Sequence, residues 1–213
     1  RYWALSAQAQ GGLDAASAAA RRLRNLCLQR LCRLPAEVDG ARAFAHFTGA
    51  NTLTDRIAAL GVLLHRGLTP APTALRIFAQ RHSGDALTTD KWLALLASTP
   101  RASALETVAA LLSGPHWQPT NPNRVRAVLG AFARNNVPAF HRADGAGYAL
   151  LLEQIAALDA INPQVASRLL SVFEHWRRFD PKRRELLSQG LQALQAQLHS
   201  RDSHEVLARL MQP

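Results

Sequence analysis

Residues 21–34 read RRLRNLCLQRLCRL, and this stretch decides the fold class. Its apolar residues recur at spacings of three and four, which is the period of one face of an α-helix. Arginines fill most of the other positions, as they do on a solvated helix face. The apolar positions are Leu23, Leu26, Cys27, Leu28, Leu31 and Leu34, and the basic positions are Arg21, Arg22, Arg24, Arg30 and Arg33. The pattern predicts an amphipathic helix within residues 13–34.

The helical period continues along nearly the whole chain. Proline, glycine and capping residues separate the periodic segments, and Thr52 to Asp55 is close to a capping box. No segment shows the alternating β-branched pattern of a strand. The chain is therefore predicted to be all-α. We expect further helices over residues 52–66, 70–82, 86–98, 102–113, 121–135, 147–159, 162–178, 181–199 and 202–211.

The spacing of these helices indicates how they are arranged. Many helices follow one another through short turns in steps of ~20 residues, which favours stacked helix pairs over a four-helix bundle. The steps suggest a curved α-solenoid, a superhelix of helix pairs, as one helical domain over residues 1–213, although the sequence shows no strict repeat. The chain begins at Arg1 without an initiator Met, so we expect it to be part of a longer polypeptide.

Composition limits the partners that the chain can have. The formal net charge is +10, but Lys91 and Lys182 are the only lysines among 25 basic residues, and a GC-rich coding bias also produces such an arginine excess. The charge alone does not require a nucleic-acid partner, although a basic face attracts phosphate. No apolar run approaches the ~18–20 residues that span a bilayer, so we expect no membrane partner.

The two cysteines indicate the cellular compartment of the protein. Cys27 and Cys32 are five residues apart on the predicted helix, which separates their Cα atoms by about 8 Å. That distance is too long for a disulfide bond in an intact helix. We expect two reduced thiols in a cytoplasmic protein.

Catalytic motifs are missing from the sequence. There is no Gly-x-Ser-x-Gly turn, no glycine-rich phosphate loop followed by lysine, and the eight histidines are scattered. Residues 204–208 read HEVLA, which places Ala208 where a zinc-binding H-E-x-x-H motif needs its second histidine. We expect no catalytic residue, no metal site and no cofactor in this chain.

Two similar segments are the best candidates for a binding site. Residues 121–126 read NPNRVR and residues 162–168 read NPQVASR. In each, Asn is a suitable N-cap and Pro occupies the first helical position. Helix N-termini carry partial positive charge, so two such ends with arginines would suit an anion or a carbonyl group. The candidate lining residues are Arg126, Gln164 and Arg168, with Asn121, Arg124 and Asn162 as possible additions; the alternative is that these arginines form helix-end or interhelical salt bridges.

The same segments belong to a longer series that resembles a known family. In order, the series also contains FTGANTLTDRIAAL at residues 47–60, DKW at 90–92, LETV at 105–108, GAFA at 130–133, AFH at 139–141 and DGAGY at 144–148. Together these segments resemble the C-terminal helical domain of bacterial aminopeptidase N, in the M1 family of zinc aminopeptidases. The resemblance runs from about residue 44 to residue 181. It also implies the curved solenoid of stacked helix pairs, which is the arrangement of this domain in the family.

The resemblance implies that this chain is one domain of a larger enzyme and that catalysis takes place in another domain. The catalytic domain of the same polypeptide would lie upstream, bind zinc and hydrolyse the N-terminal peptide bond of peptide substrates. This chain would roof the active site and line the substrate-access cavity. The positions that match Arg126, Gln164 and Arg168 line the cavity wall in the family.

A second hypothesis comes from a different functional class. A free-standing basic α-solenoid could bind an acidic protein or a nucleic acid, and the net charge favours it. Residues 176–184 read WRRFDPKRR, which interleaves aromatic and basic side chains and is the best nucleic-acid-like segment. We prefer to interpret this run as a solvated basic turn between two helices, because the ordered family segments favour the aminopeptidase hypothesis.

Overall fold

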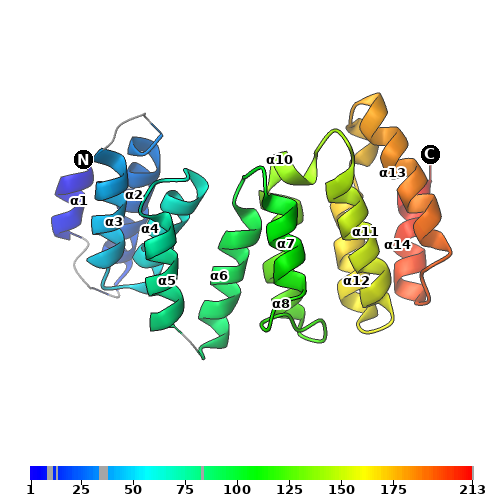
Figure 1. Ribbon diagram of the computed structural model, residues 1–213, viewed down its shortest axis with the longest axis horizontal. Helices are drawn as coiled ribbons and strands as arrows, with labels where there is room; N and C mark the ends of the chain where they lie inside the picture. The colour runs from blue at the N-terminus through cyan, green and yellow to red at the C-terminus, as the bar shows by residue number, and fades with distance from the viewer. Residues whose placement is uncertain (9–11, 13, 34–37, 83, 213) are drawn as a thin grey trace. The chain divides into compact units, whose positions relative to one another are not determined.

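The computed structural model describes residues 1–8, 12, 14–33, 38–82 and 84–212. Within these residues the chain forms helices and no strand (Figure 1), which confirms the all-α prediction. The chain divides into two compact units, residues 1–89 and residues 90–213, and each is described by itself. Leu13 and Leu34, which bound the first predicted helix, lie outside the described residues.

The first unit is built around α4. This helix packs against three others in the unit. Its buried residues Ala59, Leu60 and Leu63 form the centre of the unit. The helices are α1 (Tyr2–Gln8), α2 (Ala15–Leu31), α3 (Val38–Thr48), α4 (Leu53–His65) and α5 (Ala71–Arg81), and α6 (Ala86–Ser98) contains the boundary to the second unit.

Local sequence signals explain where α4 begins and ends. The Thr52 hydroxyl accepts a hydrogen bond from the Asp55 N–H at 3.2 Å, as the capping-box pattern predicts. Asp55 is buried and bonds to Arg24 and Asn25 of α2, which fastens the start of α4 to its neighbour. After α4, Gly67 adopts a φ of 61°, a left-handed conformation that favours glycine.

The second unit stacks helices in which each element contacts its neighbours. α12 packs against α11 and α14, and α13 packs against α11 and α14. The elements are α7 (Ala104–Leu112), α8 (Pro122–Val125), the π-helical segment η1 (Arg126–Gly130), α9 (Ala131–Asn135), α10 (Val137–Phe140), α11 (Ala146–Asp159), α12 (Pro163–Leu170), η2 (Ser171–Phe173), η3 (Trp176–Arg178), α13 (Pro181–Gln195) and α14 (Arg201–Met211).

An aromatic cluster and one buried amide hold this unit together. Phe132, Phe140, Tyr148 and Phe173 are buried, and the Phe140 ring makes contacts with the other three rings. Asn136 is also fully buried. Its side-chain N–H₂ donates to the carbonyl oxygens of residues 97 and 99 at 2.9 and 3.0 Å, which caps the C-terminal end of α6.

The structure differs from the predicted boundaries in the last third of the chain. The helix predicted over residues 162–178 ends at Leu170 and continues as two short 3₁₀ turns. The Trp176 indole N–H donates to the Leu210 carbonyl at 3.0 Å, so a bond to α14 sets the chain path here. The helix predicted over 181–199 ends at Gln195, because residues 199 and 200 are bonded to the Asp159 carboxylate.

Candidate functional site

Asn121 and Asn162 both cap helices, as their sequence positions predict. The Asn121 side-chain oxygen accepts from the N–H groups of Asn123 and Arg124 at 3.0 and 3.4 Å. The Asn162 side-chain oxygen accepts from the Val165 N–H at 3.3 Å. A proline follows each cap at the first helical position. Both amide oxygens therefore serve the backbone of their own helices.

Arg124 is a buried structural residue. Its side chain lies with Nε 2.7 Å from Asp90 Oδ1, and its Nη1 donates to the His116 carbonyl at 2.8 Å. The Nε–Oδ1 contact is close but poorly aligned, so it is an ion pair rather than a hydrogen bond. Arg124 is only 4% exposed, which leaves little of it for a ligand.

Arg126, Gln164 and Arg168 are exposed to solvent. Arg126 Nη2 donates to the Asn123 side-chain oxygen at 2.5 Å, and this neutral contact leaves its charge unpaired. Gln164 and Arg168 lie one turn apart on α12, so they share a helix face. In the part of the chain that is described, neither Arg126 nor Arg168 forms an ion pair, as the salt-bridge alternative would require.

The π-helical segment at Arg126 is a feature that the sequence pattern does not reveal. The Ala131 N–H reaches back five residues to the Arg126 carbonyl, where an α-helix would reach back four. Such single π turns inside α-helices are frequent at functional sites. The turn begins at a candidate lining residue and ends at Gly130, so it adds a structural reason to look for function at this place.

The basic run at residues 176–184 has structural partners. Arg177 donates to the carbonyl oxygens of Leu210 and Met211 at 2.6 and 2.9 Å, and its guanidinium lies 4.7 Å from the centre of the Trp176 ring. Arg183 donates twice to the His141 carbonyl. Cations at these positions complement the negative C-terminal ends of helices. Two of the basic side chains in the run therefore stabilise the fold.

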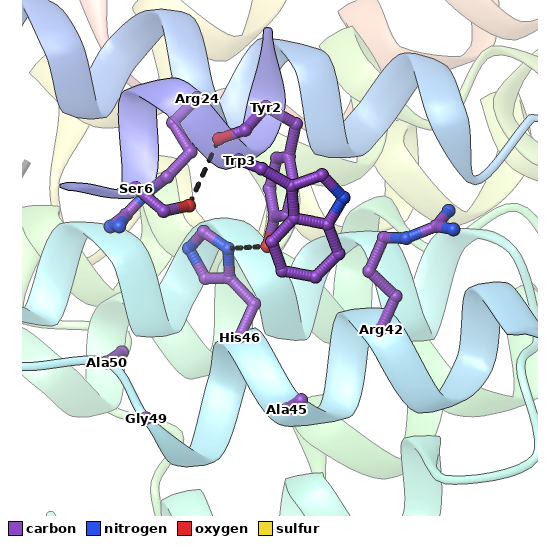
Figure 2. A pocket seen from close by; sticks show the side chains of 9 residues that line it. All are labelled: Tyr2, Trp3, Ser6, Arg24, Arg42, Ala45, His46, Gly49 and Ala50. Carbon is purple, nitrogen blue, oxygen red and sulfur yellow. Dashed lines mark hydrogen bonds between the residues drawn. The ribbon is translucent and has the colours of Figure 1, made fainter. Parts of the chain in front are cut away.

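A pocket of about 200 Å³ lies in the first unit between α1, α2 and α3 (Figure 2). The Tyr2 hydroxyl and His46 Nδ1 are 2.8 Å apart at this pocket, and Ser6 donates to the Tyr2 carbonyl. Burial, and then the charge of Arg24, lower the pKa of His46 to about 4. His46 is therefore neutral near pH 7 and ties α1 to α3 through Tyr2.

The two arginines that line this pocket are already neutralised. Arg24 forms an ion pair with Asp55 at 2.7 Å, and Arg42 forms one with Asp39 at 2.5 Å. Both aspartates are buried. The pocket consequently offers no unpaired charge to an anionic ligand, in contrast to the surface around Arg126.

No metal site is found among the described residues, since no three His, Cys, Asp or Glu side chains gather around one point. In the HEVLA segment, His204 Nε2 lies 3.1 Å from the Leu198 carbonyl, and Glu205 pairs with Arg201 at 2.7 Å. These side chains do not fit a zinc ion. Across the described helices, none is long and apolar enough to cross a membrane.

Comparison with known proteins identifies relatives of this chain. The chain matches aminopeptidase N of Caulobacter vibrioides at 39% identity over 86% of this chain, and aminopeptidase N of Escherichia coli at 38% over 83%. These matches cover 21% and 20% of the relatives, so the chain spans about a fifth of their length. It corresponds to their C-terminal domain portion.

A solved structure shows the same fold. The crystal structure of Legionella pneumophila aminopeptidase A in complex with aspartic acid matches with a TM-score of 0.88 and 25% identity. The match covers 99% of this chain and 26% of that chain.

A family model matches almost the whole chain, over residues 1–212, and is described as a domain of unknown function (DUF3458_C) with ARM repeats. ARM repeats are α-solenoids, so this match and the solved structure confirm the predicted fold class. The chain therefore belongs to the DUF3458_C family of ARM-repeat domains.

Proposed function

We propose that this chain is the non-catalytic C-terminal domain of a zinc aminopeptidase that releases N-terminal amino acids from peptides. One observation carries the proposal: the relatives named aminopeptidase N match at up to 39% identity, but only over about a fifth of their length. The remaining four-fifths leave room for a separate catalytic domain. The domain described here roofs the active site and lines the cavity through which peptides enter.

The zinc ion of such an enzyme would be bound outside this chain. When bound, zinc polarises the peptide carbonyl and activates water. The described side chains do not fit it, because the necessary set of ligands is missing. The contribution of this chain is to bind and orient the substrate.

Arg126, Gln164 and Arg168 are the residues that we propose to contact the substrate. The two exposed arginines are suited to a peptide carboxylate, which an arginine can hold with two parallel N–H bonds. The Gln164 amide can both donate to and accept from a peptide backbone. A peptide whose amine points toward the catalytic domain would extend its carboxylate toward these side chains.

The state of the cysteines supports a cytoplasmic enzyme. Cys27 and Cys32 are free thiols, which fit a reducing compartment. Burial raises the pKa of the Cys32 thiol and keeps it protonated and unreactive. A disulfide between the two residues in the native protein would contradict this assignment.

The rival function has less support. In it, a free-standing solenoid binds nucleic acid or an acidic protein. Its best surface was the basic run at residues 176–184, where Arg177 and Arg183 bond to backbone carbonyls. The rival predicts tight, salt-sensitive binding of this chain to DNA or RNA.

The test compares this chain with the complete polypeptide that contains it. We expect the chain alone to retain no stoichiometric zinc after dialysis and to release no amino acid from alanyl peptides. The complete polypeptide should contain zinc, cleave such peptides and lose activity on chelation. A zinc ion in the isolated chain together with peptidase activity, or a complete polypeptide without aminopeptidase activity, would overturn the proposal.

A further inference from the structure

Exposed apolar side chains are concentrated in the first two helices. Six large apolar side chains are exposed among the described residues, and three of them, Trp3, Leu26 and Leu31, lie in α1 or α2. Trp3 is 72% exposed and Leu26 is 46% exposed. A hollow of about 550 Å³ lies against α2, and both Leu23 and Leu26 line it. Contiguous exposed apolar surface of this kind marks an interaction site, whereas a single exposed residue does not.

The hollow lies on the side of α2 that points away from α4. Arg24 bonds to Asp55 of α4, and Leu28 is fully buried, so these two residues mark the inner face of α2. Leu26 is two residues from each of them, which is about 200° of helix rotation. We call the opposite side, which lines the hollow, the outer face of α2. Its residues recur at helical spacing and are Ala15, Ala18, Ala19, Arg22, Leu23 and Leu26.

The last two helices have a different surface. No large apolar side chain is exposed among the described residues of α13 and α14. The exposed residues of α14 are Arg201, Asp202, His204, Glu205, Ala208 and Arg209. In repeat proteins the terminal repeats have a polar outer face, whereas internal repeats bury apolar faces against both neighbours. α14 therefore suits the end of a solenoid, and α2 suits an internal position.

The outer face of α2 also carries positive charge. Arg22 lines the hollow, and Arg30 lies one turn beyond Leu26. Both arginines are exposed and, in the described part of the chain, neither forms an ion pair. A fitting partner therefore combines an apolar stripe with acidic side chains at its edges. A second copy of this chain would bring the same basic face against it, and like charges repel.

We propose that the outer face of α2 binds a helix pair of the same polypeptide, formed by the residues immediately before Arg1, as one more repeat of the solenoid. In a solenoid each repeat contacts the repeats next to it in sequence. α1 begins at Tyr2 and packs against α2, so a preceding helix reaches this face through a short connection. The inference rests on the proposed function only in that the chain is part of a longer polypeptide, as the coverage of about a fifth of the relatives supports.

Photo-cross-linking in the complete polypeptide identifies what covers this face. The photoreactive amino acid p-benzoylphenylalanine replaces Leu26, and mass spectrometry locates the peptide to which it is joined. An ARM repeat has about 40–47 residues, so we expect the cross-link to fall within about 50 residues upstream of Arg1. The control replaces Arg184, an exposed residue of α13, where we expect no cross-link to that upstream segment.

Cysteine labelling in the complete polypeptide measures the burial of the same face. Leu26→Cys should react with a maleimide roughly tenfold more slowly than Arg184→Cys, because a covered thiol reacts only when the contact opens. Peptide mass spectrometry separates the label at position 26 from labels at Cys27 and Cys32. The far-UV circular dichroism of both variants should match that of the wild type.

Three results would overturn the inference. They are a cross-link from position 26 to a second copy of the polypeptide, a cross-link to a part of the polypeptide beyond the preceding repeat, and equal labelling rates at positions 26 and 184. Neither measurement uses peptidase activity. An inactive polypeptide that still gives the expected cross-link would therefore contradict the proposed function and leave the additional repeat in place.

Discussion

The carboxylate of Asp159, the last residue of α11, bonds to Ser200 at the start of α14. Asp159 Oδ2 accepts from the Ser200 N–H at 2.8 Å and from the His199 N–H at 2.7 Å, while Oδ1 accepts from the Ser200 hydroxyl at 2.5 Å. The Ser200 Oγ in turn accepts from the Ser203 N–H as the N-cap of α14. One side chain therefore fixes how two stacked helices meet.

Asp159→Ala should destabilise the protein strongly. Asp159 is 1% exposed, and removal of its carboxylate leaves the partly buried N–H groups of His199 and Ser200 without their acceptor. Hydrogen bonds to a charged group are worth about 1.5–3 kcal/mol, so we expect a loss of about 3 kcal/mol in the free energy of unfolding. Urea denaturation measures this loss of stability. The control is Glu153→Gln on the exposed face of the same helix, for which we expect a change of less than about 0.5 kcal/mol. Equal effects of the two substitutions on stability would contradict the structural role of the Asp159 carboxylate.

The same carboxylate should make stability depend on acid pH. Burial raises the pKa of Asp159, but hydrogen bonds led by that of the Ser200 hydroxyl outweigh burial and lower the pKa from 3.8 to about 2. Because the pKa is lower in the folded state, the stabilisation is complete above about pH 4 and is lost as the pH falls through 2. The difference in unfolding free energy between wild type and Asp159→Asn should narrow over that window by about 2 kcal/mol. A constant difference from pH 6 to pH 2 would be inconsistent with this explanation.

Arg124 and Arg126 should differ sharply in their effect on stability. Arg124→Met leaves the Asp90 charge partly buried without its partner, which should cost about 3 kcal/mol. Arg126→Met removes an exposed side chain and should change stability by less than about 0.5 kcal/mol. Adding Asp90→Asn to Arg124→Met should recover part of the loss. Thermal denaturation that ranks Arg126→Met as the more damaging change would refute the assignment of roles.

The Tyr2–His46 contact should be visible in a histidine titration. NMR should give His46 a pKa of about 4, because burial and then Arg24 lower it from 6.5. Its folded pKa is below the unfolded value, so the associated stability is present above pH 6.5 and declines as the pH falls toward 4.

Removing the Tyr2 hydroxyl tests the same contact independently. Tyr2→Phe leaves His46 Nδ1 without its partner, and we expect a cost of about 1 kcal/mol. Arg22→Gln in α2 is the control, because Arg22 is exposed and should contribute little. A His46 pKa near 6.5, or a larger effect at Arg22 than at Tyr2, would show that the contact is not formed.

Sequence periodicity predicted the fold because helix boundaries depend on local chemistry. The capping residues Thr52, Asn121 and Asn162 bond to their own helices as expected. Boundaries that depend on long-range contacts were wrong. The break after Leu170 and the end of α13 follow from bonds to Leu210 and Asp159, which no local pattern encodes.

The candidate site was less predictable than the fold. Arg124 and Arg126 are two residues apart and look equivalent in the sequence, yet one is buried against Asp90 and the other is exposed. The π turn from Arg126 to Gly130 has no signal in the sequence pattern and appears only in three dimensions. The role of Arg126, Gln164 and Arg168 in substrate binding stays a prediction.

The most direct test of the central claim is a kinetic comparison in the complete polypeptide. Arg168→Ala should raise KM for peptides by roughly tenfold, since losing ~1.4 kcal/mol of binding is a factor of ten. Aminoacyl amides, which lack a trailing carboxylate, should be hydrolysed almost as by wild type. Arg184→Ala serves as the control for charge, and thermal denaturation confirms that Arg168→Ala is folded. If Arg168→Ala changes the kinetics of peptides and amides equally, or changes neither, this chain does not line the substrate cavity at Arg168.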